Sequence, residues 1–170
     1  GIKEFIALAS KMKDDNFEFH IAGKLDLENP NAVSRDDFEK CLSETNIIYH
    51  GHTQFEQMSE IYKATDIFLL PSYREGTSKV ILEACSMELP IITTDVPGCN
   101  NIIIDEFNGF LCKPKDYKDL LRVMNKFINT KDEEKSRMSK NSRKFVINNF
   151  SEEFFFEKYI KYINSVLKIK

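Results

Sequence analysis

The sequence contains no tryptophan, and among its 170 residues it has only six glycines and five prolines. So little glycine and proline excludes the collagen-like and low-complexity classes of protein. No apolar run approaches the roughly 20 residues that a membrane-spanning helix needs, and no charged-then-apolar signal segment opens the sequence. A chain of this length with 42% hydrophobic residues is long enough to form one domain with a sizeable core.

Neither sign of charge dominates, because 24 Lys and Arg stand against 27 Asp and Glu. A nucleic-acid partner normally requires a strong basic excess, so the charge balance argues against one. The four cysteines form no C-x-x-C pair and have no histidine at metal-ligand spacing; they are Cys41, Cys85, Cys99 and Cys112. We expect reduced thiols with a structural role in a soluble, intracellular domain.

Hydrophobic periodicity switches repeatedly between that of a helix and that of a strand up to about residue 114. Helices are predicted at 2–13, 35–45, 54–64 and 78–88, with a short helical turn at 99–104. Strands are predicted at 17–22, 47–50, 67–70, 91–94 and 109–112. This alternation is typical of a Rossmann-like, doubly wound parallel sheet, and the apolar run 67–70 is typical of a strand buried on both faces.

Residues 115–170 show only helical periodicity, with helices expected at 116–129, 132–147 and 152–168. Thr130 and Ser151 are suitable N-caps for the last two. A parallel α/β unit usually begins with a strand, whereas this sequence begins with a helix. We therefore expect the first strand of the sheet to lie outside the sequence.

The densest group of chemically useful residues is Pro71-Ser72-Tyr73-Arg74-Glu75-Gly76-Thr77-Ser78-Lys79-Val80-Ile81-Leu82-Glu83-Ala84, which joins a strand to a helix. Gly76 allows a ligand to approach the backbone closely, and Thr77 or Ser78 can cap the helix. Free amides at Ser78 and Lys79 would form an anion site suited to a diphosphate, with Glu75 and Glu83 able to accept hydrogen bonds from hydroxyls on either side. The structural alternative is an ordinary turn followed by two solvated carboxylates.

A second polar turn follows the next strand, in the segment Pro90-Ile91-Ile92-Thr93-Thr94-Asp95-Val96-Pro97-Gly98. Because parallel strands end at the same edge of a sheet, the two turns are predicted to form a crevice. Asp95 and Asn100 would face it, either as structural caps or as substrate contacts.

The segments DIFLLPSYREGTSKVILEACSMELPIITTDVPGC and NGFLCKP, within residues 66–114, resemble the donor-binding half of the group 1 retaining glycosyltransferases, family 4, of the GT-B fold. The resemblance rests on two glutamates separated by seven residues, on Pro90, on Gly98 and on the turn at Gly109, and it extends weakly over 1–170. It implies that 1–170 is the C-terminal nucleotide-sugar-binding domain and that an N-terminal acceptor domain lies outside the sequence. LDLENP and TTDVPGC are most similar to bacterial enzymes that extend capsule, O-antigen or other lipid-linked glycans.

The resemblance also implies a role for each matching residue. Glu75 would be the catalytic-site glutamate that binds hydroxyls of the transferred sugar, beside the backbone of Gly76 and Thr77. The amides of Ser78 and Lys79 would hold the diphosphate, and Glu83 would hold the ribose hydroxyls. A loop after the strand 47–50 would lie near the nucleotide base and consists of Gly51, His52 and Thr53, although His50 and His52 are equally well explained as surface or strand-end histidines.

The sequence departs from the family pattern at two places, which leaves the sugar preference open. Gly76-Thr77-Ser78 stands where many members have a phenylalanine after the first glutamate, and Leu89 stands where many have a glycine. In addition, the family supplies an arginine and a lysine to the diphosphate from a segment upstream of Gly1.

The resemblance implies no cofactor and no metal, with a nucleotide-diphosphate sugar as the donor and a UDP-sugar favoured over a GDP-sugar. The nearest acidic pair, Asp26-Leu27-Glu28, is better explained as solvated charge. The expected reaction is retaining transfer of a hexose or N-acetylhexosamine to a lipid-linked glycan in bacterial surface polysaccharide or lipopolysaccharide synthesis, at the cytoplasmic face of the inner membrane. The alternatives are a non-catalytic nucleotide-binding module and a non-hydrolysing sugar-nucleotide epimerase.

The last predicted helix has too much apolar surface for one stripe of contact. Its apolar residues are Phe154, Phe155, Phe156, Tyr159, Ile160, Tyr162, Ile163, Val166 and Leu167. We expect this surface to meet the other domain; the alternative is contact with anionic lipid through Lys158, Lys161, Lys168 and Lys170.

Overall fold

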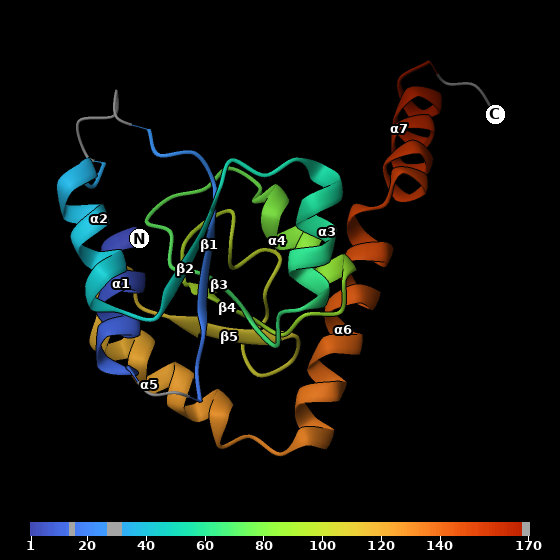
Figure 1. Ribbon diagram of the computed structural model, residues 1–170. Helices are drawn as coiled ribbons and strands as arrows, with labels where there is room; N and C mark the ends of the chain where they lie inside the picture. The colour runs from blue at the N-terminus through green and yellow to red at the C-terminus, as the bar shows by residue number, and fades with distance from the viewer. Residues whose placement is uncertain (14–15, 27–31, 168–170) are drawn as a thin grey trace.

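The computed structural model describes residues 1–13, 16–26 and 32–167 (Figure 1). Each helix and strand predicted from periodicity is present, with ends that differ by a few residues. The elements in order are α1 (Ile2–Lys11), β1 (Phe19–Ala22), α2 (Arg35–Glu44), β2 (Ile47–Gly51), α3 (Phe55–Lys63), β3 (Phe68–Leu70), α4 (Lys79–Ser86), β4 (Ile91–Thr94), β5 (Gly109–Cys112), α5 (Tyr117–Ile128), α6 (Asp132–Phe150) and α7 (Glu152–Leu167).

The described strands form two parallel sheets rather than one continuous sheet. β1 pairs with β2, and β3, β4 and β5 pair in that order. Figure 1 shows α1, α2 and α5 on one side of the strands and α3, α4 and α6 on the other. The α/β fold with a helical C-terminal region is therefore confirmed.

A groove lies between the two sheets, with β1 on one side and β3 on the other. Each of these strands is paired on one edge only. The cavity of the groove, about 900 Å³, is lined by residues of both strands, including His20, Ile21, Phe68 and Leu69. Strand edges carry unpaired backbone donors and acceptors, so the edges of β1 and β3 that line this groove are open to pairing.

The groove explains why one prediction about β3 is wrong. The apolar run 67–70 predicts a strand buried on both faces, but Phe68, Leu69 and Leu70 are only half-buried. β4 has a neighbour on each side, and all four of its residues are buried. A continuous apolar run does not distinguish these two environments.

The core consists of two groups of buried side chains. One lies between α1, α5 and the strands and includes Leu8, Ile92 and Leu120. The other surrounds α4 and includes Ile81 and Ile102. Together they hold the carboxyl end of β3 and the start of α4 in fixed positions.

The two predicted caps have different outcomes. The Ser151 hydroxyl accepts a hydrogen bond from the amide of Phe154 at 3.2 Å, which confirms it as the cap of α7. Thr130 does not cap α6, whose N-cap residue is Lys131. The Thr130 hydroxyl instead donates to the carbonyl of Lys126, because it lies at the end of the last turn of α5.

The C-terminal helix α7 projects away from the rest of the molecule (Figure 1). Among its exposed apolar side chains, Phe156, Tyr159 and Tyr162 each have about two thirds of their surface accessible, at 68%, 65% and 67%. In the part of the chain that the structure describes, no other element covers these apolar side chains of α7. Of the four lysines considered for lipid contact, Lys168 and Lys170 lie outside those residues.

All four cysteines are free thiols, as predicted. Cys85, Cys99 and Cys112 are buried, and burial raises the pKa of both Cys85 and Cys112 to about 12. These thiols are protonated at neutral pH, which suits a structural role. In the described part of the chain, no helix combines the length and the apolar character needed to cross a membrane.

Candidate functional site

The turn between β3 and α4 holds Glu75 in a defined position. The Ser72 hydroxyl donates to Glu75 Oε1 at 2.7 Å, and Glu75 itself is half-buried. Thr94 at the end of β4 donates its hydroxyl to the carbonyl of Ser72, and Thr93 donates to the carbonyl of Leu70 at 2.7 Å. The end of β4 therefore fixes the backbone from which Glu75 projects.

The two polar turns predicted to share an edge lie against each other. The Ser78 amide donates to the carbonyl of Gly98 at 3.3 Å. Gly98 has a φ of +87°, and a Cβ at this position would collide with the carbonyl oxygen of Gly76 and lie 2.6 Å from that of Glu75. Only glycine adopts this positive φ without strain and also leaves room for the two carbonyl oxygens, so Gly98 determines how closely the two turns approach each other.

The start of α4 has unpaired hydrogen-bonding groups. Its first intrahelical bond runs from the Leu82 amide to the Ser78 carbonyl, so the amides of Lys79, Val80 and Ile81 have no partner within the helix. Ser78 is 2% exposed, and its hydroxyl oxygen has no hydrogen-bond partner. An anion bound here would meet free amides at the positive end of a helix dipole.

One detail differs from the sequence-based expectation. The amide of Ser78 is engaged by Gly98, so it is not free to hold a diphosphate. The free groups at this turn are the Ser78 hydroxyl and the amides of the following residues. Thr77 and Lys79 are exposed at the surface beside them.

Glu83 lies in the second turn of α4 and is half-buried. Its Oε2 accepts a hydrogen bond from the hydroxyl of Tyr62 on α3, at 3.2 Å. Burial and the neighbouring Glu83 carboxylate raise the pKa of Tyr62 far above its ordinary value. Sequence reasoning missed this partner, because a single aromatic residue on an amphipathic helix indicates only a core position.

Of the proposed base-binding residues, Gly51 is the last residue of β2, and His52 and Thr53 follow it. β2 belongs to the sheet that does not contain β3, the strand that leads to Glu75. The Gly23 amide donates to the Gly51 carbonyl at 2.8 Å, which joins the ends of β1 and β2. His50 hydrogen-bonds His20 through ring nitrogens 2.8 Å apart. The reading of His50 as a strand-end histidine is thereby favoured.

Asp95 and Asn100 contact each other at the exposed edge of the second turn. The Asn100 side-chain amide donates to Asp95 Oδ1 at 2.8 Å. This bond closes the turn that carries Gly98, which favours the structural role for the pair.

In the part of the chain that the structure describes, no three His, Cys, Asp or Glu side chains lie close enough together to hold a metal ion. Leu27 and Glu28, from the acidic pair considered above, lie outside the described residues.

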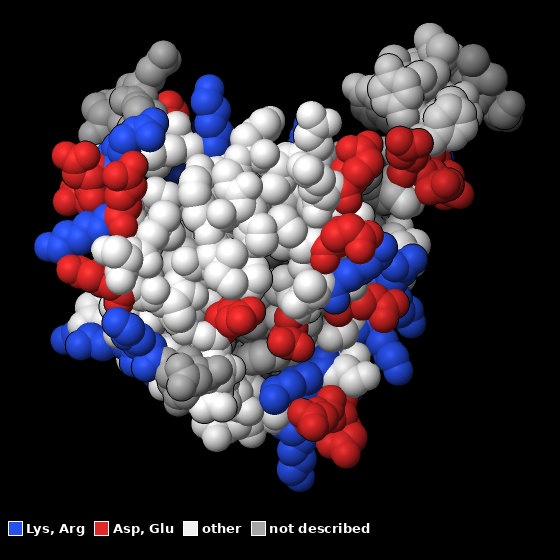
Figure 2. Space-filling model, viewed as in Figure 1, with Lys and Arg blue, Asp and Glu red and all other residues white. Residues whose placement is uncertain are grey.

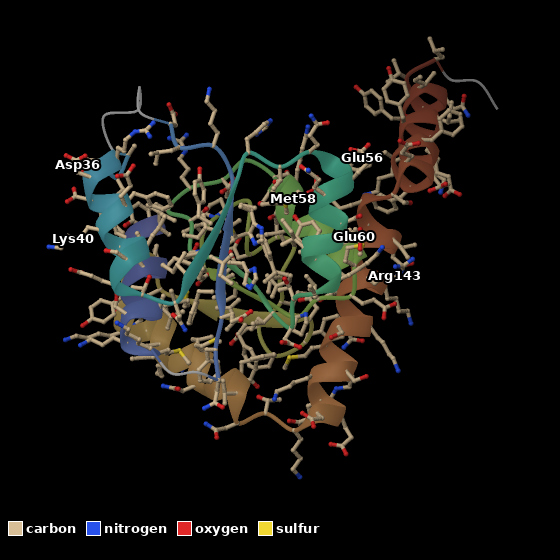
Figure 3. All side chains as sticks on the ribbon, in the orientation of Figure 1. Asp36, Lys40, Glu56, Met58, Glu60 and Arg143 are labelled. Atoms are coloured by element: carbon tan, nitrogen blue, oxygen red, sulfur yellow. The ribbon has the colours of Figure 1, made fainter. Side chains whose placement is uncertain are left out.

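The groove between the sheets reaches the same edge as these turns, since Ser72 and Val80 line one end of its cavity. Figure 2 shows that Lys, Arg, Asp and Glu lie mainly around the margin of this face, which leaves the area over β1 and β2 largely uncharged. In Figure 3, Met58 of α3 points inward toward this groove, which it lines, whereas Glu56 and Glu60 point outward.

Arg143 of α6 contacts the C-terminal end of α4, where its guanidinium donates a hydrogen bond to the Ser86 carbonyl at 2.7 Å.

The fold is that of a Rossmann-like α/β domain, a class of fold in which ligands usually bind at the carboxyl ends of the strands. Residues 1–145 match the family model described as glycosyl transferases group 1. The chain belongs to that family.

Two curated relatives match nearly the whole chain. The capsular polysaccharide biosynthesis glycosyltransferase CapM of Staphylococcus aureus is 29% identical over 168 residues, which is 98% of this chain and 42% of the relative. The N,N'-diacetylbacillosaminyl-diphospho-undecaprenol alpha-1,3-N-acetylgalactosaminyltransferase of Campylobacter jejuni is 30% identical over 170 residues, with 99% and 42% covered. The chain thus spans less than half the length of these relatives.

Solved structures show the same fold. Sucrose-phosphate synthase from Thermosynechococcus elongatus superposes with a TM-score of 0.83 at 21% identity, over 100% of this chain and 43% of that one. Anabaena HepE in complex with UDP-glucose gives a TM-score of 0.82 at 16% identity, over 97% and 45%. The residues of this chain therefore have the fold of a part of each of these two longer chains.

Proposed function

We propose that this chain is the donor-binding domain of a retaining glycosyltransferase. The observation that carries the proposal is the start of α4, where a buried, unpartnered Ser78 hydroxyl and free helix amides follow Glu75 and precede Glu83 in the chain. A nucleotide-diphosphate sugar has complementary chemistry, with an anionic centre and hydroxyls at both ends.

Each group would act on a different part of the donor. The amides of Lys79, Val80 and Ile81 and the Ser78 hydroxyl would bind the diphosphate and stabilise the negative charge that develops as it leaves. Glu75, held by Ser72, would accept hydrogen bonds from the transferred sugar near its anomeric carbon. Glu83 would accept hydrogen bonds from the ribose hydroxyls, with Gly51, His52 and Thr53 toward the base.

The substrates of similar proteins support a narrower proposal. The structure of HepE contains UDP-glucose. The name of the Campylobacter jejuni relative specifies a sugar linked to diphospho-undecaprenol as the acceptor. So does the name of a galactosyltransferase of Escherichia coli, which is 38% identical over 91 residues. We propose that a UDP-hexose or UDP-N-acetylhexosamine is the donor and a lipid-linked glycan the acceptor. Such an acceptor would place the reaction at the cytoplasmic face of the membrane.

We also propose that the groove between β1 and β3 receives a further parallel strand from a longer protein. Both facing edges are unpaired, and the chain spans only 42% of its relatives. Gly1 packs against Pro71 at the carboxyl end of β3, so a strand that leads into Gly1 would run parallel to β3 and continue into α1. The added strand, α1 and β1 would then form a β-α-β unit, and such units are right-handed in nearly all proteins.

Amide hydrogen exchange tests the added strand. We expect the groove-facing amides of β1 and β3 to exchange at least roughly tenfold more slowly in the longer protein than in residues 1–170, because new hydrogen bonds protect them. The amides of β4, which is paired on both sides, serve as the internal control. Equal exchange of β1 and β3 in the two proteins would rule out a strand in the groove.

The reaction is tested by incubating the protein, within its full-length chain, with UDP-hexoses or UDP-N-acetylhexosamines and an undecaprenyl-diphosphate-linked sugar. We expect transfer with retained anomeric configuration, read from the product by NMR. Interconversion of the donor sugar without transfer would instead indicate an epimerase, and binding without any turnover would indicate a non-catalytic module.

A further inference from the structure

We propose that Tyr62 is a positioning residue that orients the Glu83 carboxylate toward the ribose of the donor, an inference that rests on the proposed function of this site. Tyr62 lies on α3, outside the segment 71–84 from which Glu75, Ser78 and Glu83 project. Its hydroxyl donates to Glu83 Oε2 at 3.2 Å, which leaves Oε1 available for a ligand.

The surroundings of Tyr62 hold its hydroxyl in place. The side chain is 5% exposed, and its ring packs against Phe68 of β3 in an edge-to-face contact with centroids 5.9 Å apart. A long glutamate side chain loses rotamer freedom when it is held in one geometry. Because α3 and β3 fix the phenol, the carboxylate is held in that geometry before the donor arrives.

The hydroxyl of Tyr62 keeps its proton at neutral pH and donates it in the hydrogen bond to Glu83. Burial and the adjacent Glu83 carboxylate both raise the pKa of Tyr62, so the phenol remains neutral. Glu83 is then left as the acceptor that the hydroxyls of a ribose require. This chemistry distinguishes Tyr62 from a buried tyrosine that satisfies its hydroxyl on a backbone carbonyl.

The test uses calorimetry on the full-length protein to compare the wild type with Tyr62→Phe in their affinities for two probes, UDP and 2′,3′-dideoxyuridine diphosphate. We expect the variant to bind UDP about three- to tenfold more weakly than the wild type, with affinity for the dideoxy probe unchanged within twofold. In transfer assays the loss should appear in KM for the donor rather than in kcat. The ring contact with Phe68 survives in the variant, which preserves packing.

Two further variants separate a positioning role from a structural one. Ser142 of α6 is another residue with a buried hydroxyl, which donates to the Asn108 carbonyl at 2.6 Å. Ser142→Ala should lower thermal stability without changing the affinity for either probe. Tyr62→Phe should add no further loss of UDP affinity in a Glu83→Ala background, because the phenol acts through that carboxylate.

The outcomes are distinguishable. If Glu83→Ala weakens UDP binding but Tyr62→Phe does not, the inference about Tyr62 is wrong and the donor site stands. Equal weakening of both probes by Tyr62→Phe would show a general structural effect and would also overturn it. If neither the wild type nor the variants bind UDP, the proposed function fails and the inference fails with it.

Discussion

Replacing Gly98 by alanine is expected to destabilise the protein by at least about 3 kcal/mol and to abolish donor binding. A positive φ of +87° costs an alanine roughly 1–2 kcal/mol on its own. The added Cβ would also collide with the carbonyl of Gly76, which must move together with Glu75 and the start of α4. Urea unfolding measures the first effect and UDP titration the second.

Gly51→Ala is the matched control for that prediction. Gly51 also has a positive φ, +67°, but nothing lies within 4 Å of the position of its added Cβ. We expect a loss of only roughly 1–2 kcal/mol, from backbone strain alone. Equal losses in the two variants would show that close contact between the turns does not stabilise the site.

Glu75→Gln is expected to lower kcat/KM for transfer roughly ten- to hundredfold. The change keeps the shape of the side chain and an oxygen that can accept from Ser72, but it removes the charge offered to the sugar. A hydrogen bond to a charged group contributes about 1.5–3 kcal/mol, and about 1.4 kcal/mol corresponds to a factor of ten in rate. Steady-state kinetics at several donor concentrations measure the effect.

Glu88→Gln provides the control for the loss of a glutamate charge near α4. Glu88 lies beyond the opposite end of this helix, where its Oε1 is 3.8 Å from Arg143 Nε. We expect its kcat/KM to stay within about twofold of the wild type. If Glu75→Gln also stays within twofold, Glu75 makes no interaction with the transition state.

The order of elements was predictable from sequence because their periodicities differ sharply. β4 and β5 were located to the residue, at 91–94 and 109–112, since apolar residues there are bounded by Pro90, Asp95 and turn residues. Ser151 was identified as a cap because acidic residues and an apolar run follow it. Thr130 has the same residue type, but its hydroxyl bonds back to the preceding helix, a choice that depends on where α5 ends.

The contacts between elements were not predictable from a single sequence. Tyr62 and Glu83 are far apart in the chain, and only the packing of α3 against α4 brings them together. The same holds for the engagement of the Ser78 amide by Gly98. The half-buried state of β3 depends on which strands pair, and the apolar run 67–70 carries no information about its partners.

The most direct test of the donor site is amide-resolved NMR of the full-length protein titrated with UDP-N-acetylglucosamine, UDP-galactose and GDP-mannose. The account predicts that a UDP-sugar shifts the amides of Lys79, Val80 and Ile81 most strongly, and that Glu83→Ala weakens the titration. Shifts confined to the groove between β1 and β3, or no shift at the start of α4 with any of these donors, would contradict it.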